Sequence, residues 1–279
     1  MQHYVNDVTV KAFKAQLQND ERSEGTIEKY IRDVKALAAW LGGREVTREH
    51  VAAWKASLQE SGYRPATINS MLASVNTYCR KLEIDCKVRF LRIQKQLFRD
   101  EEKELTQNEY ERLIRTAQKK KNERLALLLE TIGSTGIRVS EVKYITLSAA
   151  RKGKTQISLK GKIRVILLPK KLCRKLLTYA QKQKITSGEI LITKSGRGLN
   201  HKQIWADMKN LCKDANVSPS KVFPHNLRHL FARVFYRVTR DIAKLSDLLG
   251  HSAIDTTRIY LLSSGEEHAR ELERLGLVV

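Results

Sequence analysis

Two arginines, several histidines and one tyrosine follow one another along the chain in an order that suits chemistry on a phosphate. A guanidinium group can donate two parallel hydrogen bonds to the oxygens of one phosphate, and it stays charged at any working pH. Imidazole groups exchange protons near neutrality. A tyrosine adds an oxygen nucleophile. The candidate residues are Arg138, Lys160, His225, Arg228, His251 and Tyr260.

The surroundings of Arg138 predict a binding place for an anion. The apolar run Leu125–Ile132 ends in the turn signal Gly133-Ser134-Thr135-Gly136, and a new helix is expected near Ile137. In the first turn of a helix, Arg138 would lie beside free backbone N–H groups at the positive end of the helix dipole. Glu141, one turn further along, would hold the arginine side chain. A surface Arg–Glu pair explains the same spacing equally well.

The segment after Pro224 is expected to be a helix that carries His225, Arg228 and His229 on one face, because spacings of three and four return to the same side. A zinc site made of His225, His229 and His251 is the alternative. The positive charge of Arg228 on that face and the lack of a carboxylate-rich shell argue against it. For His229 we predict a buried, hydrogen-bonded structural role.

A hairpin is predicted between the two arginines. Residues alternate in hydropathy over Thr155–Lys160 and again over Lys162–Pro169, with Gly161 between them. Lys160 is then at the hairpin tip, where a lysine is by default a solvated or phosphate-contacting charge.

Composition narrows the class of protein. A chain of 279 residues with 42% hydrophobic residues and four prolines is expected to be globular and soluble, with one large or two modest domains. The net charge of +22 indicates a polyanionic partner, more often a nucleic acid than a membrane surface. Because neither a signal peptide nor a membrane-spanning run is evident, a cytoplasmic location is expected. The four cysteines lack metal-site spacing, so reduced and mostly buried thiols are predicted.

Helical periodicity predicts two domains, and the fold class is mainly α (α+β) with one small antiparallel hairpin. Residues 1–88 are expected to be all-helical, with helices over 26–41 after Ser23, from Thr47 and from Pro65. Residues 89–103 form a charged interdomain linker. The second domain, 104–279, opens with a capping box at Thr106 and Glu109. Residues 1–98 carry a net charge of +5 and residues 99–279 carry +17, so the second domain is the stronger partner for a polyanion.

These motifs together resemble the tyrosine recombinases, which include the phage and transposon integrases. The likeness covers nearly the whole chain. It lies in the order of five motifs and in the nine-residue spacing from His251 to Tyr260: Thr135-Gly136-Ile137-Arg138-Val139-Ser140-Glu141, Lys160, His225-Asn226-Leu227-Arg228-His229, Leu249-Gly250-His251 and Tyr260.

The resemblance implies a role for each residue of the set. Arg138 and Arg228 would clamp the scissile phosphate, Tyr260 would attack it, and His225 and His251 would assist proton transfer. Lys160 would protonate the leaving 5′-oxygen, although Lys162 on the same hairpin is an open alternative, and Glu141 would have a supporting role. No metal ion, ATP or other cofactor is expected, since the arginines supply the charge that metals supply elsewhere.

The resemblance also implies partners and a function. Residues 1–88 would be a SAM-like, core-binding DNA-binding domain, and residues 104–279 the catalytic domain. The partner would be double-stranded DNA with specific recombination sites, bound by a homotetramer. The tail, residues 261–279, would either cover its own domain or dock into a neighbouring protomer. The expected function is site-specific recombination through a 3′-phosphotyrosine intermediate, for integration or excision of a mobile element or phage. A type IB topoisomerase and a catalytically silent DNA-binding regulator are the alternatives.

Overall fold

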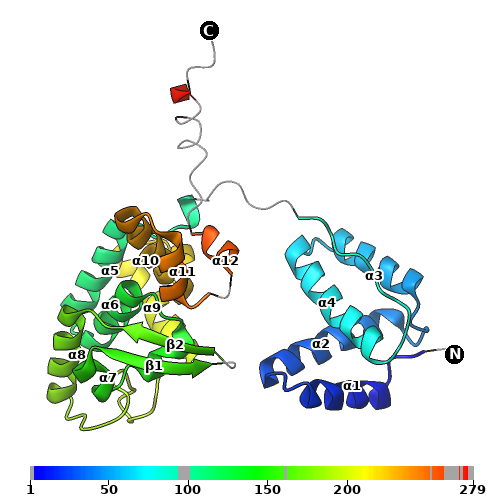
Figure 1. Ribbon diagram of the computed structural model, residues 1–279, viewed down its shortest axis with the longest axis horizontal. Coiled ribbons are helices and arrows are strands. Elements are labelled where there is room, and N and C mark those ends of the chain that lie inside the picture. The colour runs from blue at the N-terminus through cyan, green and yellow to red at the C-terminus, as the bar shows by residue number, and fades with distance from the viewer. Residues whose placement is uncertain are drawn as a thin grey trace. The chain divides into compact units, whose positions relative to one another are not determined.

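The computed structural model describes residues 3–93, 101–159, 162–251, 253–260, 270 and 273–275 (Figure 1). Contacts divide the chain into two compact units, residues 1–95 and 96–279. The boundary falls within residues 89–103, and the finer limits of the predicted domains stay predictions. Both units are mainly helical, and the sheet that the structure describes has two antiparallel strands, so the predicted fold class is confirmed.

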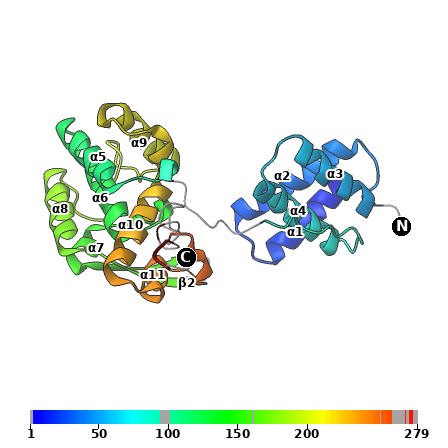
Figure 2. The ribbon, with the colours of Figure 1, turned by 90° about the horizontal axis from the view of Figure 1, so that it is seen from above.

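The N-terminal unit packs four helices around one apolar core (Figures 1 and 2). Phe13, Leu37, Trp54, Leu72 and Tyr78 are among its buried side chains. The last three helices confirm the sequence prediction, whereas the first was not predicted. The helices are α1 (Asp7–Asn19), α2 (Glu24–Leu41), α3 (Arg48–Glu60) and α4 (Pro65–Lys81).

The residues that precede α2 and α3 differ in their hydrogen bonds. The Thr47 hydroxyl accepts a hydrogen bond from the backbone N–H of His50 at 3.2 Å, which satisfies one of the free donors at the start of α3. Ser23 precedes α2 as predicted, but its hydroxyl bonds the Thr26 hydroxyl at 2.8 Å and makes no capping bond to the backbone.

The cysteines only partly follow the prediction. Cys173 and Cys212 are free and buried, as expected. Cys79 and Cys86 are joined by a disulfide, so the prediction of reduced thiols is wrong for this pair. Cys79 lies near the end of α4 and the chain turns back after it, which brings the Cα atoms of the two residues to 6.2 Å, within the range that a disulfide spans.

The C-terminal unit combines eight α-helices, three short 3₁₀ helices and one hairpin within its described residues. The capping box that opens it is confirmed: the Thr106 hydroxyl accepts from the N–H of Glu109 at 3.2 Å, and the Glu109 carboxylate accepts from the N–H of Thr106 at 2.8 Å. The helices are α5 (Gln107–Lys119), α6 (Glu123–Thr135), α7 (Leu147–Lys152), α8 (Lys170–Lys182), α9 (His201–Ala215), α10 (Pro224–Thr239), α11 (Ile242–Leu249), α12 (Asp255–Arg258), η1 (Glu101–Lys103), η2 (Val139–Tyr144) and η3 (Pro219–Lys221).

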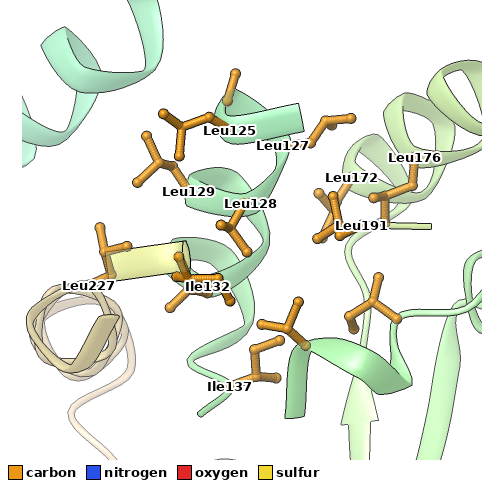
Figure 3. Close-up of a cluster of buried hydrophobic side chains, with 14 of the residues drawn as sticks. Leu125, Leu127, Leu128, Leu129, Ile132, Ile137, Leu172, Leu176, Leu191 and Leu227 are labelled. Carbon is orange, nitrogen blue, oxygen red and sulfur yellow. The ribbon is translucent and has the colours of Figure 1, made fainter. Parts of the chain in front are cut away.

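Helix α6 is the centre of this unit and packs against α5, α8 and α10. The helix carries buried side chains on most of its faces, and Leu128, Leu129 and Ile132 are fully buried. Figure 3 shows Leu227 of α10 and Leu172 of α8 among the residues around it. Because each buried leucine stabilises the fold by about 1.5–3 kcal/mol, the C-terminal end of α6 is held firmly in place. The position of this helix end therefore fixes the start of the short segment that leads to Arg138.

The predicted hairpin is confirmed as β1 (Lys154–Leu159) and β2 (Lys162–Leu167), paired with Ile157 opposite Arg164. Ile157 and Ile166 are buried against the helices, while Ile163, Val165 and Leu167 are exposed, as the period of two requires. Lys160 and Gly161, which lie between the two strands in the sequence, are outside the described residues. No helix within the described ranges is long and apolar enough to cross a membrane.

Candidate active site

Arg138 is positioned by a sharp turn at the end of α6. Gly136 has a φ of +63°, and a Cβ atom there would lie 2.4 Å from the ring of Phe231, so the chain needs glycine at this position. The turn leads to Arg138, which precedes the 3₁₀ helix η2. The prediction that Arg138 lies in the first turn of a helix is therefore wrong. Its own N–H donates to the carboxylate of Glu141 at 2.8 Å, so this donor is already used within the protein.

The predicted contact between Arg138 and Glu141 is confirmed, at 3.0 Å. It is not a surface pair, because the Glu141 side chain is 1% exposed while the Arg138 side chain is 43% exposed. The buried carboxylate thus holds one terminal nitrogen of a guanidinium group whose side chain reaches solvent. Such a group is oriented before any anion binds.

Arg228 is the most deeply buried cation of the candidate set. Helix α10 begins at Pro224, as predicted, and places Arg228 behind the turn at Gly136. Its guanidinium donates to the carbonyl oxygens of Gly136 at 2.6 Å and Leu249 at 2.7 Å, and contacts His251 Nε2 at 2.8 Å. Burial and, to a smaller extent, Arg138 lower the pKa of Arg228 to about 10, so the group stays charged at neutral pH.

His251 is held in one tautomer. Since a guanidinium has no acceptor, the Nε2 atom that contacts Arg228 must be unprotonated, and the proton lies on Nδ1. Nδ1 then donates to the hydroxyl of the buried Thr257 at 2.8 Å. Burial and the neighbouring Arg228 lower the pKa of His251 to about 4. The ring is therefore neutral at working pH.

Tyr260 lies just after the short helix α12, with its side chain 4% exposed. Its ring centroid lies 4.5 Å from that of His229, 5.8 Å from that of His251 and 6.3 Å from that of His225. The tyrosine also packs in a small apolar cluster with Leu245 and Leu249 of α11. The three histidines thus surround the tyrosine.

His229 differs from its prediction. It shares a face of α10 with His225, with ring centroids 4.5 Å apart, but its buried Nε2 has no hydrogen-bond partner among the described residues. The predicted hydrogen-bonded role is therefore wrong at this atom. Burial lowers the pKa of His229 to about 3, and the pKa of His225 is also lowered, first by partial burial and then by Arg228 and Arg138.

The structure brings together Arg138, His225, Arg228, His251 and Tyr260. Lys160 lies outside the described residues, and the structure does not choose between it and Lys162. Two further residues were missed by sequence reasoning: Thr257, which orients His251, and Arg164, which contacts Glu141. The signal for Arg164 was a charged residue at an inward-facing position of a strand.

The charges of the site favour an anion. The site holds three arginines, and two of them, Arg138 and Arg164, share the buried carboxylate of Glu141. The third is Arg228, and the lowered pKa values of the three histidines keep them neutral. Among the described residues, Arg228 contacts carbonyl oxygens, an imidazole and the side chain of Tyr260, and none of these partners is a carboxylate. A bound phosphodiester would supply the missing negative charge.

The lowered histidine pKa values predict that the protein loses stability as the pH falls from about 6.5 toward 4. An unfolded histidine takes up a proton near pH 6.5. The folded His251 does so only near pH 4 and His229 only near pH 3. The unfolded state therefore binds more protons in this window, and the free energy of unfolding falls as the pH is lowered.

This dependence is measured by urea denaturation at several pH values for the wild type and for His229→Phe, which keeps an aromatic ring at this position. Between pH 6 and 4, the free energy of unfolding should fall less steeply for the variant than for the wild type. The two slopes should differ by about 1.4 kcal/mol per pH unit, which is the contribution of one proton. Parallel pH dependences for the two proteins would show that His229 is not held neutral in the folded state.

Comparisons with known proteins identify the family of the chain. Residues 103–267 match the phage integrase family, and residues 10–83 match the N-terminal SAM-like domain of phage integrases. The tyrosine recombinase XerA of Thermococcus kodakarensis is 28% identical, over 95% of this chain and 96% of that protein. The tyrosine recombinase XerD of Halalkalibacterium halodurans is 27% identical, over 85% of this chain and 87% of that protein.

Solved structures share the fold. A lambda integrase dimer bound to a core site superposes with a TM-score of 0.72 at 18% identity, over 91% of this chain and 94% of that one. The integrase of transposon Tn1549, in complex with transposon right end DNA, has a TM-score of 0.70 at 17% identity, over 96% of this chain and 99% of that one. Because the family match spans more than half of its residues, this chain belongs to the phage integrase family, the family of the tyrosine recombinases.

Proposed function

We propose that this chain is a site-specific DNA recombinase that cuts and rejoins DNA through a 3′-phosphotyrosine at Tyr260, in the integration or excision of a mobile element or phage. The observation that carries the proposal is the placement of Tyr260 among neutral histidines, within a site whose arginines outnumber its carboxylates. This combination suits attack on a phosphodiester.

In the proposed reaction, the Tyr260 oxygen attacks the phosphorus atom and the bond from phosphorus to the 5′-oxygen breaks. A free phenol has a pKa of about 10, so its proton must be accepted during the attack. Neutral His225 is the proposed acceptor. Arg138 and Arg228 stabilise the charge on the non-bridging oxygens, and Lys160 gives a proton to the leaving 5′-oxygen.

The phosphotyrosine keeps the energy of the broken phosphodiester. A 5′-hydroxyl from another duplex reverses the attack, releases Tyr260 and joins the new strands. Each step breaks one phosphoester bond and forms another of similar energy. The proposed reaction therefore needs no ATP. The same balance distinguishes a recombinase from a nuclease, in which water takes the phosphate irreversibly.

The proposed partner is double-stranded DNA with specific recombination sites, bound by four copies of the chain in the cytoplasm. Support comes from the net charge of +22 and from neighbours in fold that were solved as complexes with DNA, including a lambda integrase tetramer bound to a Holliday junction. That structure has a TM-score of 0.71 at 18% identity, over 91% of this chain. The tail, residues 261–279, is a proposed contact between the protomers.

A nicked suicide duplex tests the proposal. The duplex is selected by the protein from a randomised pool, and a nick beside the scissile phosphate lets the short 5′-hydroxyl strand diffuse away, which traps the covalent adduct. A recombinase is expected to form the adduct and, on two intact copies of the site, to exchange strands. Adducts without strand exchange would favour a topoisomerase, and binding without adducts would favour a regulator; either result contradicts the proposal.

A further inference from the structure

Arg164 makes the strongest set of contacts in the site that the proposed reaction does not use. One guanidinium nitrogen donates to both carboxylate oxygens of Glu141, at 3.0 and 2.8 Å. The other donates to the carbonyl oxygen of Leu248 at 2.6 Å. The side chain is 8% exposed, so these bonds are largely screened from water. Charge-assisted bonds of this kind are about twice as strong as neutral ones.

The fold makes room for this arginine at some cost. The pairing of β2 with β1 turns Arg164 toward the helices, between the exposed side chains of Ile163 and Val165. Gly250 has a φ of +64°, and a Cβ atom there would lie 2.6 Å from Arg164 Cδ, so only glycine lets the side chain pass. Burial without enough partners is unfavourable for a cation, and Nε of Arg164 has no partner among the described residues. Burying an apolar side chain at this position would cost less free energy than burying the cation.

The partners of Arg164 lead to two groups that face the phosphate. The Glu141 carboxylate accepts hydrogen bonds from both the guanidinium group and the backbone N–H of Arg138. Leu248 lies at the end of α11, and the segment Leu248–His251 consists of the last two residues of this helix and the turn that follows. The Leu249 carbonyl of this segment accepts from Arg228, and the segment ends at His251. Arg164 is thus the described side chain that joins the carboxylate behind Arg138 to the segment that carries His251.

We propose that Arg164 is a positioning residue of the reaction: it locks Glu141 and the Leu248–His251 segment together, so that Arg138, Arg228 and His251 converge on one phosphate. This inference rests on the proposed function. In this proposal Arg164 itself does not touch the DNA, because its side chain is buried and its two terminal nitrogens donate to Glu141 and Leu248. Its loss should weaken the arginine clamp while the tyrosine and the DNA-binding surfaces remain.

The test compares Arg164→Met with the wild type on two suicide duplexes, one with an ordinary scissile phosphodiester and one with a methylphosphonate there. The methylphosphonate lacks the negative charge that the arginine clamp must stabilise. On the phosphodiester, Arg164→Met should form adduct roughly 100-fold more slowly, since misplacement by about 1 Å has effects of this size. On the methylphosphonate, the ratio of wild type to variant should shrink to under about tenfold.

Arg124→Met is the matched control. Arg124, at the start of α6, also joins a carbonyl oxygen, that of Ile192 at 3.1 Å, to a carboxylate, that of Asp207 at 3.0 Å. The substitution removes the same kinds of bonds at a place outside the candidate site. Its adduct rates should match the wild type on both duplexes. Arg164→Lys, which keeps a charge but cannot reach both partners in the same geometry, should lie between wild type and Arg164→Met.

Several outcomes would overturn the inference. Equal losses for Arg164→Met on both duplexes would indicate a general loss of folded protein, and rates equal to those of Arg124→Met would show that the link does not matter. If Arg164→Met does not fold, Arg164→Lys must show the same smaller loss on the methylphosphonate, or the inference fails. A wild type that forms no adduct on either duplex would instead overturn the proposed function, and the inference with it.

Discussion

Replacing Tyr260 with phenylalanine should abolish covalent attachment to DNA while the duplex is still bound. The substitution removes only the hydroxyl oxygen and keeps the ring that packs against His229 and His251. Since the proposed nucleophile is lost, adduct formation should fall by roughly 10⁴-fold or more, as it does when other enzymes lose their nucleophile. The free energy of unfolding should change by less than about 1.5 kcal/mol.

Adducts on the nicked suicide duplex are counted on denaturing gels, and the modified residue is located by mass spectrometry of the trapped complex. Tyr236→Phe is the matched control, because Tyr236 packs against the same small cluster as Tyr260 and is not a proposed nucleophile. It should form adducts like the wild type. A strand attached to any residue other than Tyr260 would refute the proposed reaction.

Replacing Arg228 with alanine should destroy both activity and much of the stability of the catalytic unit, whereas Arg138→Ala should mainly destroy activity. Both variants lose a proposed contact to the phosphate, and each should form adducts roughly 100–1,000-fold more slowly. Arg228 is also buried and donates to the carbonyl oxygens of Gly136 and Leu249. Each buried carbonyl left without its donor costs about 1–3 kcal/mol. The Arg138 side chain reaches solvent, and in Arg138→Ala the Glu141 carboxylate is still paired with Arg164.

Denaturant unfolding and adduct formation are measured side by side for the two variants. The expected pattern is a large drop in unfolding free energy for Arg228→Ala and a small one for Arg138→Ala, with low adduct rates for both. Equal stability of the two variants would show that Arg228 does not support the turns at Gly136 and Leu249. An active Arg228→Ala would show that the phosphate is held elsewhere.

The sequence predicted the local elements well wherever a local hydrogen bond defines them. Thr106 forms its predicted capping box with Glu109, and the helix predicted from Thr47 begins there, where Thr47 caps it; both caps are bonds between residues three apart. The hairpin followed from the alternation of hydropathy on either side of Gly161. Helix α1 was not predicted, and Arg138 was assigned to the first turn of a helix, whereas it is the extended residue just before the 3₁₀ helix η2, where Glu141 accepts a hydrogen bond from its backbone N–H.

The sequence by itself determined which reactive groups the chain carries, their order and the helices and strands that hold most of them. Only the tertiary structure decided which groups meet. Arg228 bonds a carbonyl 92 residues away, Arg164 bonds one 84 residues away, and the tautomer of His251 depends on Arg228 across 23 residues. The physical reason is range: side-chain periodicity and caps report interactions within a turn or a strand pair. A buried cation's partners depend on how distant segments pack, and among the described residues that packing also leaves His229 Nε2 without a hydrogen-bond partner.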